Sequence, residues 1–137
     1  MMVDLRIVRQ VLREHLLTVP AVTSANFLPE DRPRKRPIGI HVQETLQPEE
    51  KPIANKLVEA AGRVQYDVMY MADRGTEQPE ALAKSIVDIF PPGTQLDSQG
   101  ITIYIDKVQR SPGRQFDTAW WFVPVSILWR TYATTAS

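Results

Sequence analysis

The strand predicted near the end of the sequence, residues 118–132, constrains the fold more than any other segment. Apolar side chains alternate along it with the period of two that is typical of a β-strand. One face is entirely apolar and consists of Trp121, Val123, Val125, Ile127 and Trp129. The opposite face is mixed but carries Trp120 and Phe122. A pair of helices covers only one side of a sheet, so this second face needs another cover.

Two interpretations of the second face remain open. In one, the strand is central and loops of the same chain partly cover it. In the other, Trp120, Phe122 and Leu128 pack against another subunit, because large aromatic residues are enriched in interface cores. Pro124 has no N–H to donate, so the strand is expected to lie at an edge, or to bulge, at that point. An aromatic edge strand favours strand pairing between chains.

The other segments predict two amphipathic helices and three more strands. The first helix covers residues 3–17 and is closed by Pro20. The second helix begins after Thr76, its expected N-cap, and ends before Pro91. The additional strands are residues 38–42, 62–71 and 101–106.

These elements together predict the fold class. A length of 137 residues fits a single domain, residues 1–137. We predict an α+β fold with a mostly antiparallel four-stranded sheet and two helices on one face, in the order α-β-β-α-β-β. The last two strands are expected to pair as a hairpin. Residues 27–37 and 47–56 are predicted to be loops, because prolines interrupt helices and central strands.

Composition excludes several classes of function. The chain has no cysteine, which excludes disulfides, thiolate catalysis and cysteine-based zinc sites. Its 16 basic residues balance its 16 acidic residues, so the net charge gives no general attraction to nucleic acid or to a membrane surface. No apolar run reaches the roughly 18 residues of a membrane span. The absence of a signal-type apolar segment predicts folding in a reducing cytoplasm.

The sequence offers little for catalysis. His15 is expected at the end of the first helix, and His41 is expected at the surface of a strand. Asp67 and Asp106 lie on strand faces, where cations across the sheet could pair with them. No glycine-rich phosphate loop or nucleophile turn occurs. We therefore expect no catalytic residue, no cofactor and no metal site, while an unrecognised site near His41 or Asp67 stays open.

One charged loop segment remains as a candidate for binding. It contains four cations, Arg32, Arg34, Lys35 and Arg36. The segment could be a solvated loop, or it could contact an acidic protein surface or DNA phosphates. Glu30 and Asp31 dilute its charge, and a dedicated nucleic-acid binder is usually basic overall. Specific DNA binding is therefore not expected.

The whole pattern resembles a known family. After an amphipathic helix, a Pro-rich loop and a strand, the second helix ends in Phe90-Pro91-Pro92-Gly93-Thr94. The closing hairpin ends in the Trp-Phe-Val-Pro-Val-Ser-Ile-Leu-Trp-Arg run of residues 121–130. This order resembles the tail terminator, or tail completion, proteins of long-tailed phages and related minor tail and neck proteins. The resemblance spans nearly the full chain.

The resemblance implies a structural virion protein without an active site. It would form a homo-oligomeric ring, a hexamer, that caps the tail tube, stops tube growth and provides the head-joining surface. Its partners would be the tail tube protein and head–tail connector proteins, first in the host cytoplasm and then in the virion tail. The alternatives are a head–tail adaptor, a tail tube-type protein, and a small enzyme or DNA-contacting module with an unrecognised site.

Overall fold

A computed structural model describes most of the chain. The described residues are 4–31, 35, 37, 39–54, 57–98, 100–116 and 119–134. The elements in chain order are α1 (Leu5–Leu16), β1 (Phe27–Leu28), β2 (His41–Ala54), β3 (Leu57–Met71), a 3₁₀ turn (Ala72–Arg74), α2 (Glu77–Ile89), β4 (Gln95–Ser98), β5 (Ile101–Arg110), β6 (Arg114–Phe116) and β7 (Trp120–Thr134).

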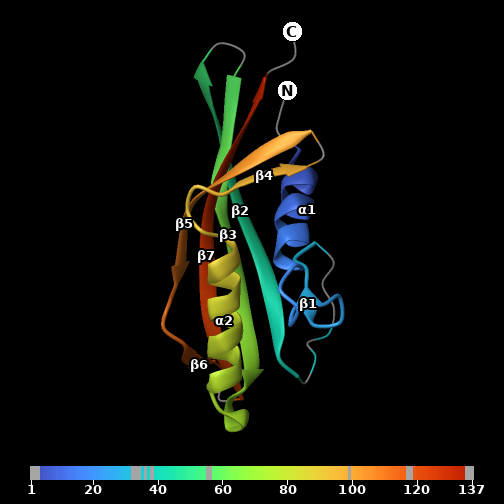
Figure 1. Cartoon of the computed structure of the whole chain (residues 1–137), viewed down its shortest axis with the longest axis vertical. Coiled ribbons are helices and arrows are strands. Elements are labelled where there is room, and N and C mark those ends of the chain that lie inside the picture. Colours follow the sequence, from blue (N-terminus) through green and yellow to red (C-terminus); the bar gives the residue numbers. More distant parts are fainter. Residues whose placement is uncertain are drawn as a thin grey trace.

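A single curled sheet forms the body of the molecule (Figure 1). The strand order across it is β1-β2-β3-β7-β5-β4, and β6 also pairs with β7. β1 runs parallel to β2, whereas the other neighbouring strands are antiparallel. The predicted α+β class is confirmed. The predicted four-stranded sheet is wrong, because the described residues form a mixed sheet of seven strands.

The three strands that the sequence did not predict are short. β1, β4 and β6 contain 2, 4 and 3 residues, too few for an alternating pattern to be recognised. Each forms by pairing with a longer neighbouring strand. The last of them, β6, begins at Arg114.

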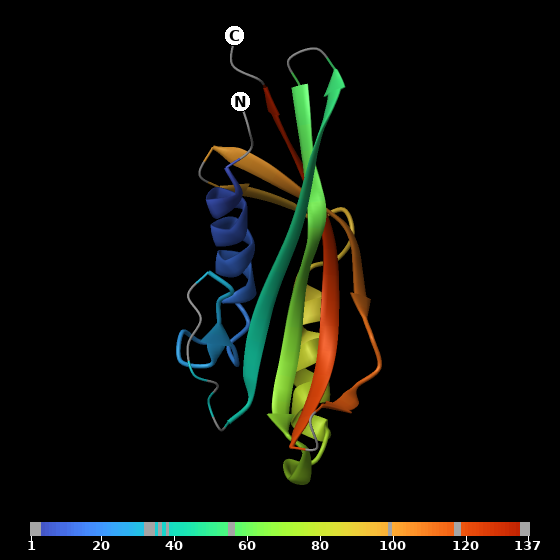
Figure 2. The same cartoon turned by 180° about the vertical axis from the view of Figure 1, so that it is seen from behind.

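Both helices pack on the same, concave face of the sheet (Figure 2). Their buried apolar side chains join those of the sheet in one core. The helices contribute Val8, Val11, Leu12, Leu16, Leu82, Ala83 and Ile86. The apolar face predicted for the last strand lies in this core, with Val123, Val125, Ile127 and Trp129 almost fully buried. Trp121 lies at the border of the core and is only partly buried.

β7 is an interior strand, with β3 on one side and β5 and β6 on the other. The predicted hairpin pairing is confirmed by the β5–β7 ladder. The expected local edge or bulge at Pro124 corresponds to a gap in the ladder on one side, because β5 pairs with β7 only as far as Val125 and β6 pairs only from Phe122 onward. The Ser111 N–H donates to the Pro124 carbonyl oxygen at 3.0 Å, so this side of Pro124 faces the connection that follows β5. The proline nitrogen faces the same connection, where no ladder bond is required.

β2 extends to Ala54 and so includes much of the stretch that had been predicted as a loop. The Val42 N–H donates to the Asn26 carbonyl oxygen at 2.9 Å, and the Leu46 N–H donates to the Glu30 carboxylate at 2.7 Å. These even-numbered N–H groups point away from β3. By alternation, the even-numbered prolines of β2 lie at the open edge, where a missing donor costs no ladder hydrogen bond.

The β2–β3 hairpin and the end of β7 project past both helices (Figures 1 and 2). Pairing between these strands continues along the projection, as far as Ala54 opposite Leu57 and Leu57 opposite Thr134. We call this three-stranded projection, residues 48–54, 57–62 and 129–134, the arm. Gly62 lies at its base, opposite Pro48 on one side and Trp129 on the other.

We predict that Gly62→Ala destabilises the fold. An added Cβ would lie 2.3 Å from the Gln47 carbonyl oxygen and 2.9 Å from the Pro48 Cα, and both atoms belong to the backbone. Forcing β2 and β3 apart should lower the free energy of unfolding by about 1–3 kcal/mol. Gly39→Ala is the matched control, because its added Cβ meets nothing within 4 Å. Equal urea midpoints for the two variants would contradict the close-approach explanation.

Candidate assembly surface

The outer face of the sheet, opposite the helices, is the surface on which the sequence placed the subunit contact. Neither helix lies on it (Figures 1 and 2). Strand register arranges its side chains in rows that cross β2, β3, β7 and β5. A polar row separates two groups of larger side chains. This row consists of Thr45, Gln65, Ser126 and Gln109.

The first group, which we call the aromatic cluster, consists of Trp120, Phe122, His41, Met69 and Arg114. The Trp120 ring meets the His41 ring edge-on, with 5.2 Å between centroids. The Arg114 guanidinium lies 4.9 Å from the centroid of the Phe122 ring. Met69 lies opposite Phe122 and is buried. Trp120 and Phe122 are partly buried, so side chains of their own chain provide much of their cover.

The position predicted from the sequence is correct for one of the two histidines and wrong for the other. His15 lies in the last turn of α1, as predicted, and its Nε2 bonds to the Ile89 carbonyl oxygen of α2. His41 was expected at the surface, and this is wrong, because its exposed fraction is 0%. It does lie on the outer face, but it is buried there against Trp120, with Nδ1–H donating to the Gly39 carbonyl oxygen at 2.9 Å.

The second group surrounds Leu128, whose exposed fraction of 40% is high for a large apolar residue. Register places Arg63 of β3 opposite Leu128 on one side and Lys107 of β5 opposite it on the other. Both cations are exposed. We call these three residues the basic row. An apolar side chain flanked by two cations is thus presented on an open sheet face.

Arg130 lies next to the basic row and is held by its neighbours. Its Nε donates to Asp106 at 2.8 Å, and its guanidinium lies 4.9 Å from the Tyr104 ring centroid and 5.6 Å from that of Tyr132. The hydrogen bond to Asp106 raises the pKa of Arg130 further above its usual range. Asp106 therefore pairs with a cation across the sheet, as its strand position suggested.

The structure does not bring the three predicted contact residues together. Trp120 and Phe122 share the aromatic cluster, whereas Leu128 belongs to the basic row beyond the polar row. Phe122 and Leu128 are six positions apart, which corresponds to about 20 Å along a strand. Of these three residues, Leu128 is the one that the structure leaves exposed.

The loop of four cations begins beside a network of ion pairs. Lys35 is exposed, whereas Arg32, Arg34 and Arg36 lie outside the described residues. Just before them, Asp31 is held by α1, because Arg13 Nη2 lies 2.9 Å from its Oδ1. The start of the loop is therefore fixed to the body of the protein.

Glu44 is the buried centre of this network. Its side chain is 1% exposed, and its Oε1 lies 3.0 Å from Arg13 Nη2 and 3.6 Å from Arg9 Nε. Arg9 Nη2 also donates to Glu30 Oε2 at 3.3 Å. Because the Glu30 carboxylate in turn accepts from β2, the network joins α1, the loop start and the edge strand.

Burial and the nearby arginine charge shift the pKa values of Glu44 and Asp31 in opposite directions. Burial raises the pKa of Glu44 above its ordinary value, and the hydrogen bond and charge of Arg13 offset only part of this effect. Burial also acts to raise the pKa of Asp31, but the Arg13 hydrogen bond and charge outweigh it, so this pKa lies below its ordinary value.

This network was not predicted, although the sequence contains a signal for it. Glu44 alternates with Val42 and Leu46, which places a carboxylate on an inward-facing position of a strand. A buried carboxylate needs a cation or several donors. Arg9 and Arg13 are spaced four residues apart and therefore lie on one side of α1. The ion pairs of Glu44 with Arg9 and Arg13 could be recognised only once α1 was known to lie near this part of β2.

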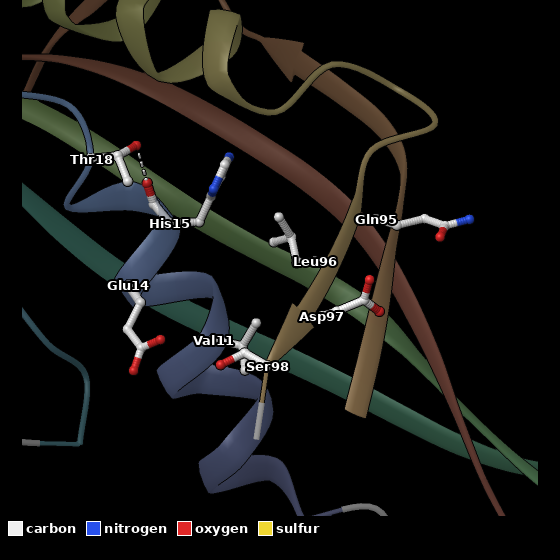
Figure 3. A pocket seen from close by; sticks show the side chains of 8 residues that line it. All are labelled: Val11, Glu14, His15, Thr18, Gln95, Leu96, Asp97 and Ser98. Atoms are coloured by element: carbon white, nitrogen blue, oxygen red, sulfur yellow. Dashed lines mark hydrogen bonds between the residues drawn. The ribbon is translucent and has the colours of Figure 1, made fainter. Parts of the chain in front are cut away.

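A groove of about 340 Å³ separates α1 from β4 (Figure 3). His15 of α1 and Leu96 of β4 face the same side, toward the end of α2, where His15 bonds to the Ile89 carbonyl oxygen. The Glu14 and Asp97 side chains are directed away from the space between α1 and β4, and the Asp97 carboxylate accepts a hydrogen bond from Thr102 of β5 (Figure 3). The complete lining is Val11, Glu14, His15, Thr18, Gln95, Leu96, Asp97 and Ser98.

The described part of the chain offers no cluster for metal chemistry. No group of three or more His, Asp or Glu side chains in these residues is placed to hold a metal ion. Asp67, a position left open for chemistry, accepts a hydrogen bond from Gln65 Nε2 at 2.8 Å, and burial raises its pKa. None of the described helices has the length and apolar character needed to cross a bilayer.

Comparison with known proteins identifies the family. The phage tail terminator protein family matches residues 8–129. This chain belongs to that family. A solved structure that is 16% identical in sequence gives a TM-score of 0.74 over 95% of this chain and 96% of the other, which supports the fold. No curated protein matched the sequence. As a phage tail terminator, the protein is a structural component of the tail, and the family implies partners in the tail tube.

We predict that Glu44→Gln changes the pH dependence of terminator stability. The folded pKa of Glu44 is raised above its ordinary value of 4.5, so wild-type stability should fall as pH rises through the interval between the two values. Glutamine resembles the protonated acid and cannot ionise. The variant should match the wild type at low pH and gain on the order of 1 kcal/mol relative to it near neutral pH.

Urea unfolding at a series of pH values measures this difference. Glu77→Gln is the control, because Glu77 is an exposed carboxylate in the first turn of α2. A Glu44→Gln protein that becomes steadily less stable than the wild type as pH rises would show that the arginine pairs outweigh burial.

Proposed function

We propose that this terminator forms a ring, a hexamer, that caps the end of the tail tube, stops addition of tube protein and presents a surface for joining the head. The observation that carries the proposal is the open outer face of the sheet. Both helices lie on the concave face, and Leu128 is exposed between Arg63 and Lys107 on the opposite one. A face of this kind in a tail protein is suited to burial against another subunit.

In this proposal the sheet of each subunit packs against its neighbour. Leu128 lies at the contact, and Trp120 and Phe122 lie at its border, where their partial burial leaves surface for a neighbouring chain. Interfaces gain most from a few well-packed apolar, aromatic and arginine side chains at their centre. The basic row and the adjoining Arg130 supply such side chains.

The cationic loop would contact the partners of the ring. Arg32, Arg34, Lys35 and Arg36 follow Glu30 and Asp31, which the arginines of α1 hold in place. A fixed loop base lowers the entropy lost when the loop meets a partner. We infer that these cations reach an acidic surface of the tube protein or of a head–tail connector, along the ring axis or toward its lumen.

Tube growth in vitro tests the capping function. Purified tube protein would be polymerised with increasing amounts of the terminator, and tube lengths would be measured by electron microscopy. Because one ring closes one tube end, small molar amounts should stop growth. Leu128→Glu should abolish the arrest. The matched control is Leu17→Glu, since Leu17 is 39% exposed but lies at the end of α1. Continued growth with the wild-type protein would exclude a capping role.

Neutralising the loop tests its role in joining. Arg34→Gln combined with Lys35→Gln should leave the unfolding midpoint unchanged but reduce attachment of capped tubes to heads. Arg74→Gln combined with Lys84→Gln removes two cations elsewhere on the surface and should have no effect. Unchanged attachment by the loop variant would remove the loop from the proposal.

A further inference from the structure

Four buried polar atoms gather between α1, β2 and β3 without a hydrogen-bond partner in the part of the chain that the structure describes. They are Glu44 Oε2, Tyr66 Oη, Arg9 Nε and Arg13 Nε. Strand register places Glu44 directly opposite Tyr66, and both side chains are buried. Buried polar groups in native proteins almost always bond to the protein or to ordered water. Four such atoms around one cross-strand pair therefore indicate a binding site inside the protein.

The Tyr66 hydroxyl is fixed in place and keeps its proton. Its ring contacts those of Phe27 and Phe90, with 6.4 Å and 6.3 Å between centroids, and its exposed fraction is 0%. Burial and, after it, the charge of Glu44 raise the pKa of Tyr66 well above its ordinary value. The hydroxyl is therefore both a donor and an acceptor at neutral pH, and it cannot turn out to solvent.

The charges around the site select a neutral ligand. Two arginines contact three carboxylates here, and the residues are Arg9, Arg13, Glu30, Asp31 and Glu44. The excess negative charge would repel an anion. Among the described residues, no group of three His, Asp or Glu side chains is placed to hold a metal ion. A small neutral molecule with both donors and acceptors satisfies these conditions, and water is the smallest of them.

We propose that a buried water molecule bridges β2 and β3 by accepting a hydrogen bond from the Tyr66 hydroxyl and donating one to Glu44 Oε2. Its second lone pair accepts from the Nε–H group of Arg9 or Arg13 of α1. Buried waters typically make about three such bonds to polar groups that have no other partner. This site is separate from the outer face and from the proposed ring.

The water makes one continuous network out of two separate parts. Asp31 at the start of the cationic loop is bound by Arg13, and Arg13 is bound to Glu44. Through the water, the network reaches Tyr66 in β3, the central strand of the sheet. A buried polar network favours one packing arrangement when all of its members are satisfied. The bound water thus fixes the position of α1 and of the loop start relative to the sheet.

Removing the hydroxyl tests whether it has a partner. In Tyr66→Phe, the urea midpoint should fall, and the pKa of Glu44, followed by carboxyl carbon NMR, should rise by about one unit because the carboxylate loses a donor chain. Tyr70→Phe is the control, since Tyr70 lies on the same strand but is partly exposed, and it should leave both quantities unchanged. A raised midpoint with an unchanged Glu44 pKa is expected for a hydroxyl without a partner and would overturn the proposal.

A high-resolution crystal structure identifies the ligand directly. It should show one water within hydrogen-bond distance of both Glu44 Oε2 and Tyr66 Oη, and the Tyr66→Phe structure should show that water lost or displaced. A direct bond between Tyr66 and Glu44, or a metal or buffer ion at the site, would overturn the water assignment. Neither experiment uses tube growth, so the water site and the capping function can fail separately.

Discussion

The fold depends on one geometric constraint, which is that a single sheet has two faces and both helices lie on the same one. β3 pairs with β7 along its whole length and with β2 from Leu57 to Met69. This rigid centre lets α1 and α2 bury the inner side chains in one core. The outer face is covered in part by side-chain contacts, such as the edge-on contact of Trp120 with His41, and stays open elsewhere, as around Leu128.

Much of this arrangement could be predicted from periodic patterns. Both helices gave a helical period, and parts of β3, β5 and β7 gave strong alternation, with the buried Trp129 among the inward residues of β7. The errors arose where a segment's position in the sheet, and not its local sequence, determines its structure. Pro48 and Pro52 indicated a loop, but both fall at positions of β2 that face an open edge. The short strands exist only because a longer neighbour offers a ladder.

The candidate site was less predictable, because exposure depends on the whole fold. The sequence named Trp120, Phe122 and Leu128 as equal members of one contact. Two of them are partly covered by His41 and Arg114, which come from distant parts of the chain. The flanking cations of Leu128 could not be found from its own strand, because they reach it through register with β3 and β5. The pairing of Glu44 with Arg9 and Arg13 of α1 could likewise not be found from the sequence of β2 alone.

The prolines at the open edge of β2 have a consequence for aggregation. An exposed strand edge is a template for fibril growth, since each free N–H and carbonyl can bind the next chain. With proline at positions 48 and 52, an incoming strand would find only intermittent donors along this edge of the arm. A terminator with an unprotected edge on its arm would risk nucleating disordered fibres, and its edge sequence counteracts that risk.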